Sequence, residues 1–150
     1  MNKFHKFFNL SWLDRRLLIS ATIAIGAVRF GLWVLPFKFL QTLLLKLERP
    51  SFSRQRRGRP SVARIVWAVK IGARFVPAAT CLAQALATKL LLRRRGYNPA
   101  LRIGVTRNEA GEFQAHAWIE YNGDIVLGYL NDMSRYSKLP PFAPEGCKSE

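Results

Sequence analysis

Cysteine, histidine and acidic residues are all scarce in this chain of 150 residues. It contains two cysteines, two histidines, and nine Asp and Glu residues against 24 Lys and Arg. Because one of the two cysteines, Cys147, lies in a polar tail, a disulfide framework is excluded, and no signal-peptide pattern with a small-residue cleavage site is present. We therefore expect a cytoplasmic protein. The shortage of acids leaves a net charge of +15, which favours an anionic partner such as a nucleic acid, a lipid surface or an acidic peptide.

Long hydrophobic runs are also missing. The longest uncharged stretch of the N-terminal region, residues 17–28, has 12 residues between Arg16 and Arg29, whereas a membrane-spanning helix needs about 20. The pattern instead predicts two packed helices, at about 12–34 and 37–47, separated at Pro36. A spanning helix that tolerates Arg29, or a face that docks on a membrane surface or a partner, remains an alternative.

Residues 49–64 form an arginine-rich stretch with Pro and Ser, which we interpret as a solvated basic loop. Its arginines are Arg49, Arg54, Arg56, Arg57, Arg59 and Arg64. The four residues 57–60 match the core of the AT-hook, a minor-groove DNA-binding element. So short a match in an arginine-rich chain is weak, and no other DNA-reading motif is present, so we do not expect nucleic acid as the partner. A second hypothesis is that the loop attracts an acidic substrate or partner.

Two further helices are predicted before the pattern changes. Ser61 caps a helix with apolar positions three and four residues apart, which ends at Pro77. Thr80 caps the next helix, at about 81–95, which is apolar nearly all round and must be buried on most of its surface. Gly96 suits the left-handed position after its end.

From Pro99 onward the apolar period is two, which predicts strands. We expect strands at 101–106, 113–121 and 124 to about 129, with the last two joined by a type I′ turn at 122–123. In the simple two-residue register Tyr121 faces Asp124, Ala117 faces Gly128, and His116 faces Tyr129. Residues 131–150 hold three prolines and few apolar positions, and they are expected to be irregular.

Cys81 and His116 are the candidate catalytic residues of this chain. A thiolate that attacks, and an imidazole that accepts and returns its proton, are the minimum pair for thiol nucleophilic catalysis. The free N–H groups and dipole at a helix start favour a thiolate. Core packing is the ordinary role for a single cysteine or histidine. The position of Cys81 in the first turn of a central helix favours the catalytic interpretation.

The order of these elements resembles the papain-like and transglutaminase-like cysteine peptidase superfamily. More closely, the stretches 80–82, 93–96, 101–105 and 115–123 resemble the lasso-peptide maturation protease, the B protein in its stand-alone leader-peptidase form. The resemblance covers about residues 8–142. It implies that Cys81 attacks the bond between leader and core of a ribosomally made precursor peptide. It also implies a separate small leader-recognition protein and an asparagine-synthetase-like cyclase as partners. We expect no cofactor and no metal.

One position departs from that family. An aspartate that orients the histidine is usual on the strand after it, where this sequence has Gly128. Asp124 lies at the hairpin tip, four residue pairs or ~13 Å from His116 at ~3.3 Å per residue. Asn131 and Asp132 follow the strand and can fold back, and we assign Asp132 as the third member. A backbone carbonyl in its place, or no third member, is the alternative.

The sequence thus predicts a single α+β domain over residues 1–150. It would have a helical part at 1–76, a transglutaminase-like core at 77–130 and a tail at 131–150. The expected function is a cysteine peptidase that removes the leader of a lasso-type precursor, with helix-start N–H groups as the oxyanion site. The rival functions are an acyltransferase of the same fold, a non-catalytic scaffold that binds leader or cyclase, and a basic protein associated with a membrane or nucleic acid.

Overall fold

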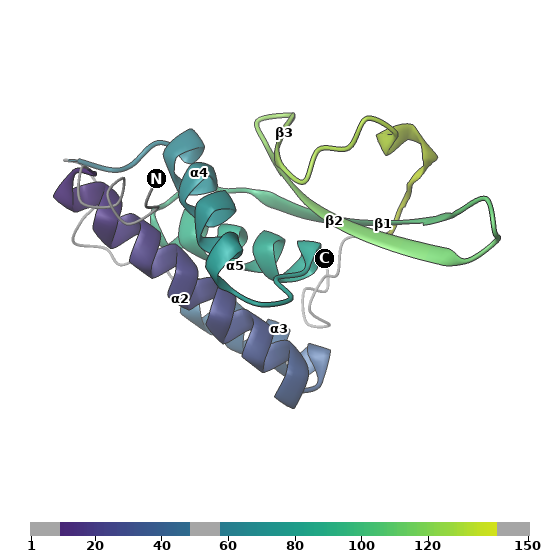
Figure 1. The fold of residues 1–150 in the computed structure, drawn as a ribbon, viewed down its shortest axis with the longest axis horizontal. Coiled ribbons are helices and arrows are strands. Elements are labelled where there is room, and N and C mark those ends of the chain that lie inside the picture. The colour runs from purple at the N-terminus through teal and green to yellow at the C-terminus, as the bar shows by residue number, and fades with distance from the viewer. Residues whose placement is uncertain (1–9, 49–57, 141–150) are drawn as a thin grey trace, which may run out of the picture.

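A layer of helices packs against one face of a small antiparallel sheet, as the computed structural model shows (Figure 1). The structure describes residues 10–48 and 58–140. Its helices are α2 (Trp12–Val34), α3 (Phe37–Leu47), α4 (Val62–Gly72) and α5 (Cys81–Arg94). Its strands are β1 (Ala100–Arg107), β2 (Phe113–Tyr121), β3 (Asp124–Leu127) and β4 (Ser137–Lys138), in the spatial order β3-β2-β1-β4. The predicted α+β class is confirmed.

The N-terminal helices α2 and α3 begin and end where the sequence predicts. Ser11 caps α2 by accepting a hydrogen bond from the backbone N–H of Asp14 at 3.2 Å. Pro36 lies between the two helices, just before α3. At this position its missing N–H costs no helical hydrogen bond. The two helices therefore form an antiparallel pair rather than one long span.

The next two helices carry the chain to the centre of the molecule. Ser61 caps α4, as expected, but regular α-helix stops at Gly72 and a 3₁₀ turn (Ala73–Phe75) completes the stretch before Pro77. Thr80 caps α5, whose side chains are buried along most of its length. Together these residues confirm α5 as the central helix of the fold.

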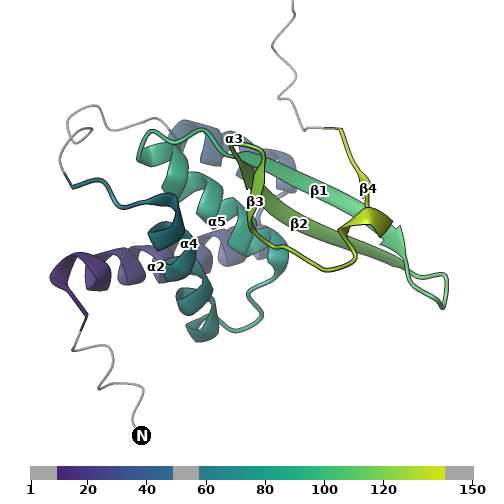
Figure 2. The same cartoon turned by 90° about the horizontal axis from the view of Figure 1, so that it is seen from above.

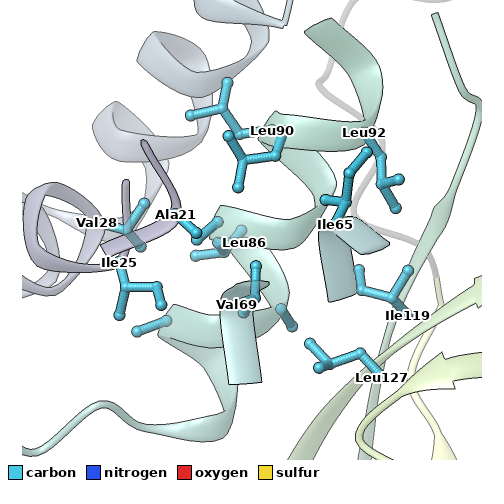
Figure 3. Packing of buried hydrophobic residues seen from close by; sticks show 14 of the residues in the cluster. Ala21, Ile25, Val28, Ile65, Val69, Leu86, Leu90, Leu92, Ile119 and Leu127 are labelled. Carbon is cyan, nitrogen blue, oxygen red and sulfur yellow. The ribbon is translucent and has the colours of Figure 1, made fainter. Parts of the chain in front are cut away.

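The core lies where α5 meets α2, α4 and the inner face of the sheet (Figure 3). Ile25 on α2, Ile65 on α4 and Leu92 on α5 are all fully buried. The sheet contributes Ile119 and Leu127 to the same cluster. Each such side chain contributes about 1.5–3 kcal/mol on burial, so these contacts fix the position of β2 against the helices.

Two buried carboxylates tie the helices together. Asp14 on α2 receives two hydrogen bonds from the Arg64 guanidinium on α4, which hold its pKa below the ordinary value. Glu48, just after α3, pairs with Lys89 at 3.2 Å and Arg93 at 3.5 Å on α5. Arg64 is thus a structural residue rather than part of a solvated loop.

Of the other arginines in the basic stretch, the structure describes only Arg59. Arg59 lies over the Tyr97 ring, 3.4 Å from its centroid, and Tyr97 in turn donates a hydrogen bond to the Pro60 carbonyl. Arg49, Arg54, Arg56 and Arg57 lie outside the described residues, whereas the last three residues of the AT-hook match, 58–60, lie inside them. The two hypotheses for this stretch, solvated loop or steering element, stay predictions.

The sheet register differs from the predicted one beyond the hairpin turn. Asn122 and Gly123 both have positive φ, 52° and 89°, as a type I′ turn requires. Tyr121 pairs with Asp124 as expected, but Glu120 pairs with Ile125 and Ile119 with Leu127, so the strand contains a β-bulge. The prediction that Ala117 pairs with Gly128 and His116 with Tyr129 was therefore wrong. The extra residue shifts the register by one, and β3 ends at Leu127.

The segment after β3 is more ordered than the sequence predicts. It contains a 3₁₀ turn (Met133–Arg135) and then β4, which pairs with β1 through Gly104 opposite Lys138. The prediction of an irregular tail was thus wrong for residues 131–140. Residues 141–150, including Cys147, lie outside the described part. Figure 2 shows this segment returning to the sheet edge beside β1.

Candidate active site

Cys81 is the first residue of α5. The hydroxyl of Thr80 accepts a hydrogen bond from the Ala83 N–H at 3.3 Å and so caps the helix. The Cys81 side chain is half-buried and packs against the edge of the core. Within the described residues, the N–H groups of Cys81 and Leu82 donate no hydrogen bond. The thiol therefore stands beside free donors at the positive end of a rigid helix.

Two side chains hold the loop that leads into Cys81. Ala78 has a positive φ of 54°, which is rare for a residue other than glycine. Its carbonyl accepts a hydrogen bond from Nε of Arg29 on α2 at 3.0 Å, and the next carbonyl, of Ala79, accepts one from Nε2 of Gln84 at 2.9 Å. Arg29, the charge that interrupts the apolar run of α2, is thereby explained as an anchor for this loop.

His116 lies in the middle of β2, opposite Gly104 on β1. Its half-buried ring is flanked by Trp118, whose ring is nearly parallel to it with the centroids 6.3 Å apart, and by Tyr136 at 5.9 Å. A Cβ at Gly104 would come within 2.9 Å of the Trp118 ring and 3.0 Å of Tyr136. Only glycine at position 104 lets these aromatic side chains close around the imidazole.

One nitrogen of the imidazole has a main-chain partner. Nε2 of His116 lies 2.7 Å from the carbonyl oxygen of Gly128. A carbonyl only accepts hydrogen bonds, so in the neutral ring Nε2 carries the proton and Nδ1 is the free base. Gly128 has φ 83°, and a Cβ there would lie 2.8 Å from the Ala117 carbonyl oxygen. Position 128, at which the resemblance led us to expect an aspartate, thus supplies a main-chain carbonyl.

Asp132 lies elsewhere. It precedes the 3₁₀ turn at Met133–Arg135 with its side chain half exposed, and its carboxylate is 4.0 Å from the Arg135 guanidinium. No hydrogen bond joins it to His116 within the described residues. The role assigned to Asp132 stays a prediction, while the carbonyl alternative has a hydrogen bond to support it.

The elements that carry Cys81 and His116 are neighbours. α5 contacts both β1 and β2, and the start of α5 lies beside β2 in both views (Figures 1 and 2). Beyond Ile119, toward His116, β2 has no described strand partner on the β3 side, because β3 has ended. No hydrogen bond joins the thiol and the imidazole directly, so their pairing stays a prediction.

Glu120 is a site residue that the sequence reasoning missed. Its carboxylate accepts hydrogen bonds from Trp118 Nε1, Arg102 Nε and Lys138 Nζ, each at 3.0 Å. Burial raises the Glu120 pKa, but these three donors outweigh that effect and set it at about 2. The alternation of His116, Trp118 and Glu120 along one strand face was the available signal. This network joins β1, β2 and β4 behind the imidazole.

Metal ligands are not gathered anywhere in residues 10–48 and 58–140. No group of three or more His, Cys, Asp or Glu side chains there is placed to hold an ion.

Comparison with known proteins places these features in a family. A family model described as the transglutaminase-like superfamily matches residues 24–140, which include α4, α5 and the whole sheet. No curated protein and no solved structure matches the chain significantly. The match covers more than half of the chain and both Cys81 and His116. The chain belongs to the transglutaminase-like superfamily.

Proposed function

We propose that this protein is a cysteine peptidase that removes the leader from a ribosomally made, lasso-type precursor peptide. The observation that carries the chemical part is the bond from Nε2 of His116 to the Gly128 carbonyl, because it leaves Nδ1 free as a base. Family membership supports thiol chemistry in general. The choice of substrate rests on the resemblance of the 80–82 and 115–123 stretches to the lasso-peptide maturation protease.

In the proposed reaction, Nδ1 of His116 takes the thiol proton and Cys81 attacks the scissile carbonyl carbon. The tetrahedral oxyanion is received by the free N–H groups of Cys81 and Leu82 at the start of α5. His116 then protonates the leaving amine, and the core peptide departs. Water, deprotonated by the same Nδ1, hydrolyses the thioester and releases the leader.

The thiol and the imidazole would meet at the edge of β2 left open by the end of β3. Ala117 and Ile119 point toward the helices, so His116 lies on the alternate face of the strand. α5 packs on the face of Ala117 and Ile119, so the proposed pairing requires the imidazole to reach Cys81 around this open edge of the strand. On this proposal the third member is the Gly128 carbonyl, which orients the ring and stabilises the imidazolium.

The partners proposed with this activity are the precursor peptide, a small leader-recognition protein and an asparagine-synthetase-like cyclase. A precursor must be presented as an extended segment to reach a half-buried thiol, and a separate recognition protein would supply that placement. The positive charge of the chain suits an acidic leader or an acidic face on that protein.

The deciding experiment is cleavage of a precursor peptide by the purified chain with its leader-recognition protein, followed by mass spectrometry. Release of intact leader and core by the wild type, and none by Cys81→Ala, is the expected result. If an added primary amine is incorporated at the cleaved carbonyl in preference to water, the protein is an acyltransferase. If Cys81→Ala supports maturation as well as the wild type, it is a scaffold.

A further inference from the structure

α2 exposes an apolar face as continuous as the one it buries. Ala21 and Ile25 are fully buried against the core. At spacings of three, four or seven residues on the other side, large apolar side chains stand in solvent: Trp12, Ile19, Ile23, Phe30 and Trp33. Trp33 is 77% exposed, although it is among the most hydrophobic side chains of the chain. Soluble monomers rarely leave so large a contiguous apolar surface unoccupied.

The same helix borders an open groove. Ile19 and Ile23 of α2 face Leu90 and Leu91 of α5 across a groove of about 450 Å³. Arg16 and Arg94 also line it. Arg29 bonds to the loop before α5, so α2 and α5 run antiparallel and these two arginines meet at the opposite end. Neither forms an ion pair with a described residue.

Charge on this part of the surface has one sign. Between residues 10 and 48 the acids are Asp14 and Glu48, both only 6% exposed and both in ion pairs. The exposed ionic groups around the groove and on α3 are basic: Arg16, Lys38, Lys46 and Arg94. An occupant of this face must therefore be apolar where it meets the helix and anionic at its margin.

α2 does not cross a membrane while the core is intact. By length and hydropathy it is long enough to span, but Leu17, Ala21 and Ile25 pack into the core against α4 and α5. Spanning would strip that face from its partners. The helix, about 34 Å long at 1.5 Å per residue, is therefore available only along its outer side.

We propose that the outer face of α2 and the α2–α5 groove dock the protein on an anionic membrane surface. α2 lies in the plane of the interface with its exposed Trp12 and Trp33 on the apolar side, and tryptophan favours the headgroup level of a bilayer. Arg16 and Arg94 meet the lipid phosphates, and the groove takes part of an acyl chain. The proposal is independent of the peptidase activity.

The chemistry of the face favours lipid over a protein partner. Specific protein interfaces carry about one hydrogen bond per 100–200 Å². Along the α2 stripe from Trp12 to Trp33, Arg16 is the one exposed polar side chain, and it already lies over the Trp12 ring. A surface with so few directional groups suits a fluid apolar layer with phosphates at its edge.

The test is flotation of the full chain with vesicles of phosphatidylcholine, with or without phosphatidylglycerol. We expect binding to the anionic vesicles, and weak binding to phosphatidylcholine alone. Ile23→Ser with Trp33→Ser should lower partitioning at least ~10-fold, because both side chains enter the interface. Arg16→Gln and Arg94→Gln should each lower it about fivefold at low salt.

The matched control lies on the sheet hairpin, far from α2 in sequence and in both views (Figures 1 and 2). Phe113 is 72% exposed with the Arg107 guanidinium over its ring, so Phe113→Ser with Arg107→Gln removes the same chemistry there. This control should bind vesicles like the wild type. Equal loss in the control and the α2 variants, or no flotation of the wild type, overturns the proposal.

Two further arms separate the alternatives. Cys81→Ala should float like the wild type, so a failure of leader cleavage leaves membrane docking untouched, and the reverse holds as well. If the wild type ignores vesicles and the Ile23→Ser, Trp33→Ser variant no longer co-elutes with the leader-recognition protein, this face is a protein-docking surface and the membrane proposal is wrong.

Discussion

Nε2 of His116 lies 2.7 Å from the carbonyl oxygen of Gly128, so a main-chain oxygen is the hydrogen-bond partner of the imidazole. The bond sets the tautomer with Nε2 protonated and Nδ1 as the acceptor. ¹⁵N imidazole spectra of the His5→Gln variant, which retains His116 as its single histidine, should show that tautomer in the neutral ring. Protonation at Nδ1 instead would contradict this assignment.

The thiol and the imidazole act as one unit in the proposed reaction. Cys81→Ala and His116→Ala should each lower leader cleavage by at least ~100-fold, with the fold unchanged by circular dichroism. Iodoacetamide should label Cys81 faster than Cys147 at neutral pH, because Cys81 stands at a helix start. Mass spectrometry of the two tryptic peptides measures both rates. Slower labelling of Cys81 would indicate a structural thiol.

A side chain at position 128 should misplace the carbonyl. Gly128→Ala puts a Cβ 2.8 Å from the Ala117 oxygen and strains a backbone at φ 83°, at a cost of about 1–3 kcal/mol in the free energy of unfolding. Displacing the carbonyl by an ångström should lower cleavage about 100-fold.

The control for that variant is Gly123→Ala. Gly123 has a similar φ of 89° but open space where its Cβ would be, so it carries the backbone strain without touching the site. It should lose stability and keep its cleavage rate. Equal cleavage by Gly128→Ala and the wild type would show that the carbonyl does not orient His116.

Asp132→Ala tests the side-chain alternative. Because Asp132 is half exposed and lies by Arg135, the variant should cleave within about twofold of the wild type, as should Asn131→Ala. Turnover of the two variants at saturating precursor is the measurement. A tenfold or larger loss in Asp132→Ala alone, with its melting temperature unchanged, would make Asp132 the third member.

Arg29→Leu keeps the aliphatic stem and removes the donor to the Ala78 carbonyl. The loop before Cys81 should loosen, lowering kcat more than it raises KM, and the free energy of unfolding should fall by about 1 kcal/mol. Arg74→Leu, an exposed arginine on the 3₁₀ turn after α4, is the control and should match the wild type. Unchanged kcat in Arg29→Leu would leave Arg29 with a purely structural role.

The Glu120→Gln variant tests whether the charge of Glu120 stabilises the fold, through the pH dependence of the free energy of unfolding. The Glu120 pKa is about 2 in the folded chain and 4.5 ordinarily, so its contribution to stability is full above pH 4.5 and is lost as the pH falls toward 2. Denaturant unfolding should show the wild type more stable than Glu120→Gln at pH 6, with the gap closing below pH 4.5. A gap independent of pH would mean that the lost hydrogen-bond geometry, not the charge, matters.

The parts of this fold that follow local rules were predictable. Helix α5 starts after Thr80 because its hydroxyl caps the helix, and the turn at Asn122 follows from the need for two positive φ values. The β-bulge was not predictable, because no residue near Val126 marks an insertion in a strand of only four residues. The hydrogen-bond partner of His116 depends on that bulge. The partner is a main-chain carbonyl, which every residue has, so no residue type in the sequence indicates it.

The surroundings of His116 are completed by a segment that follows all of the residues it covers. Tyr136, which flanks His116, and β4, which pairs with β1, both come from the last described stretch of the chain. A nascent chain that has emerged only through β3 already contains the thiol and the imidazole but lacks this cover and the Lys138 bond to Glu120. Because chains fold as they emerge from the ribosome, the surroundings of His116 stay incomplete until the segment after β3 has emerged.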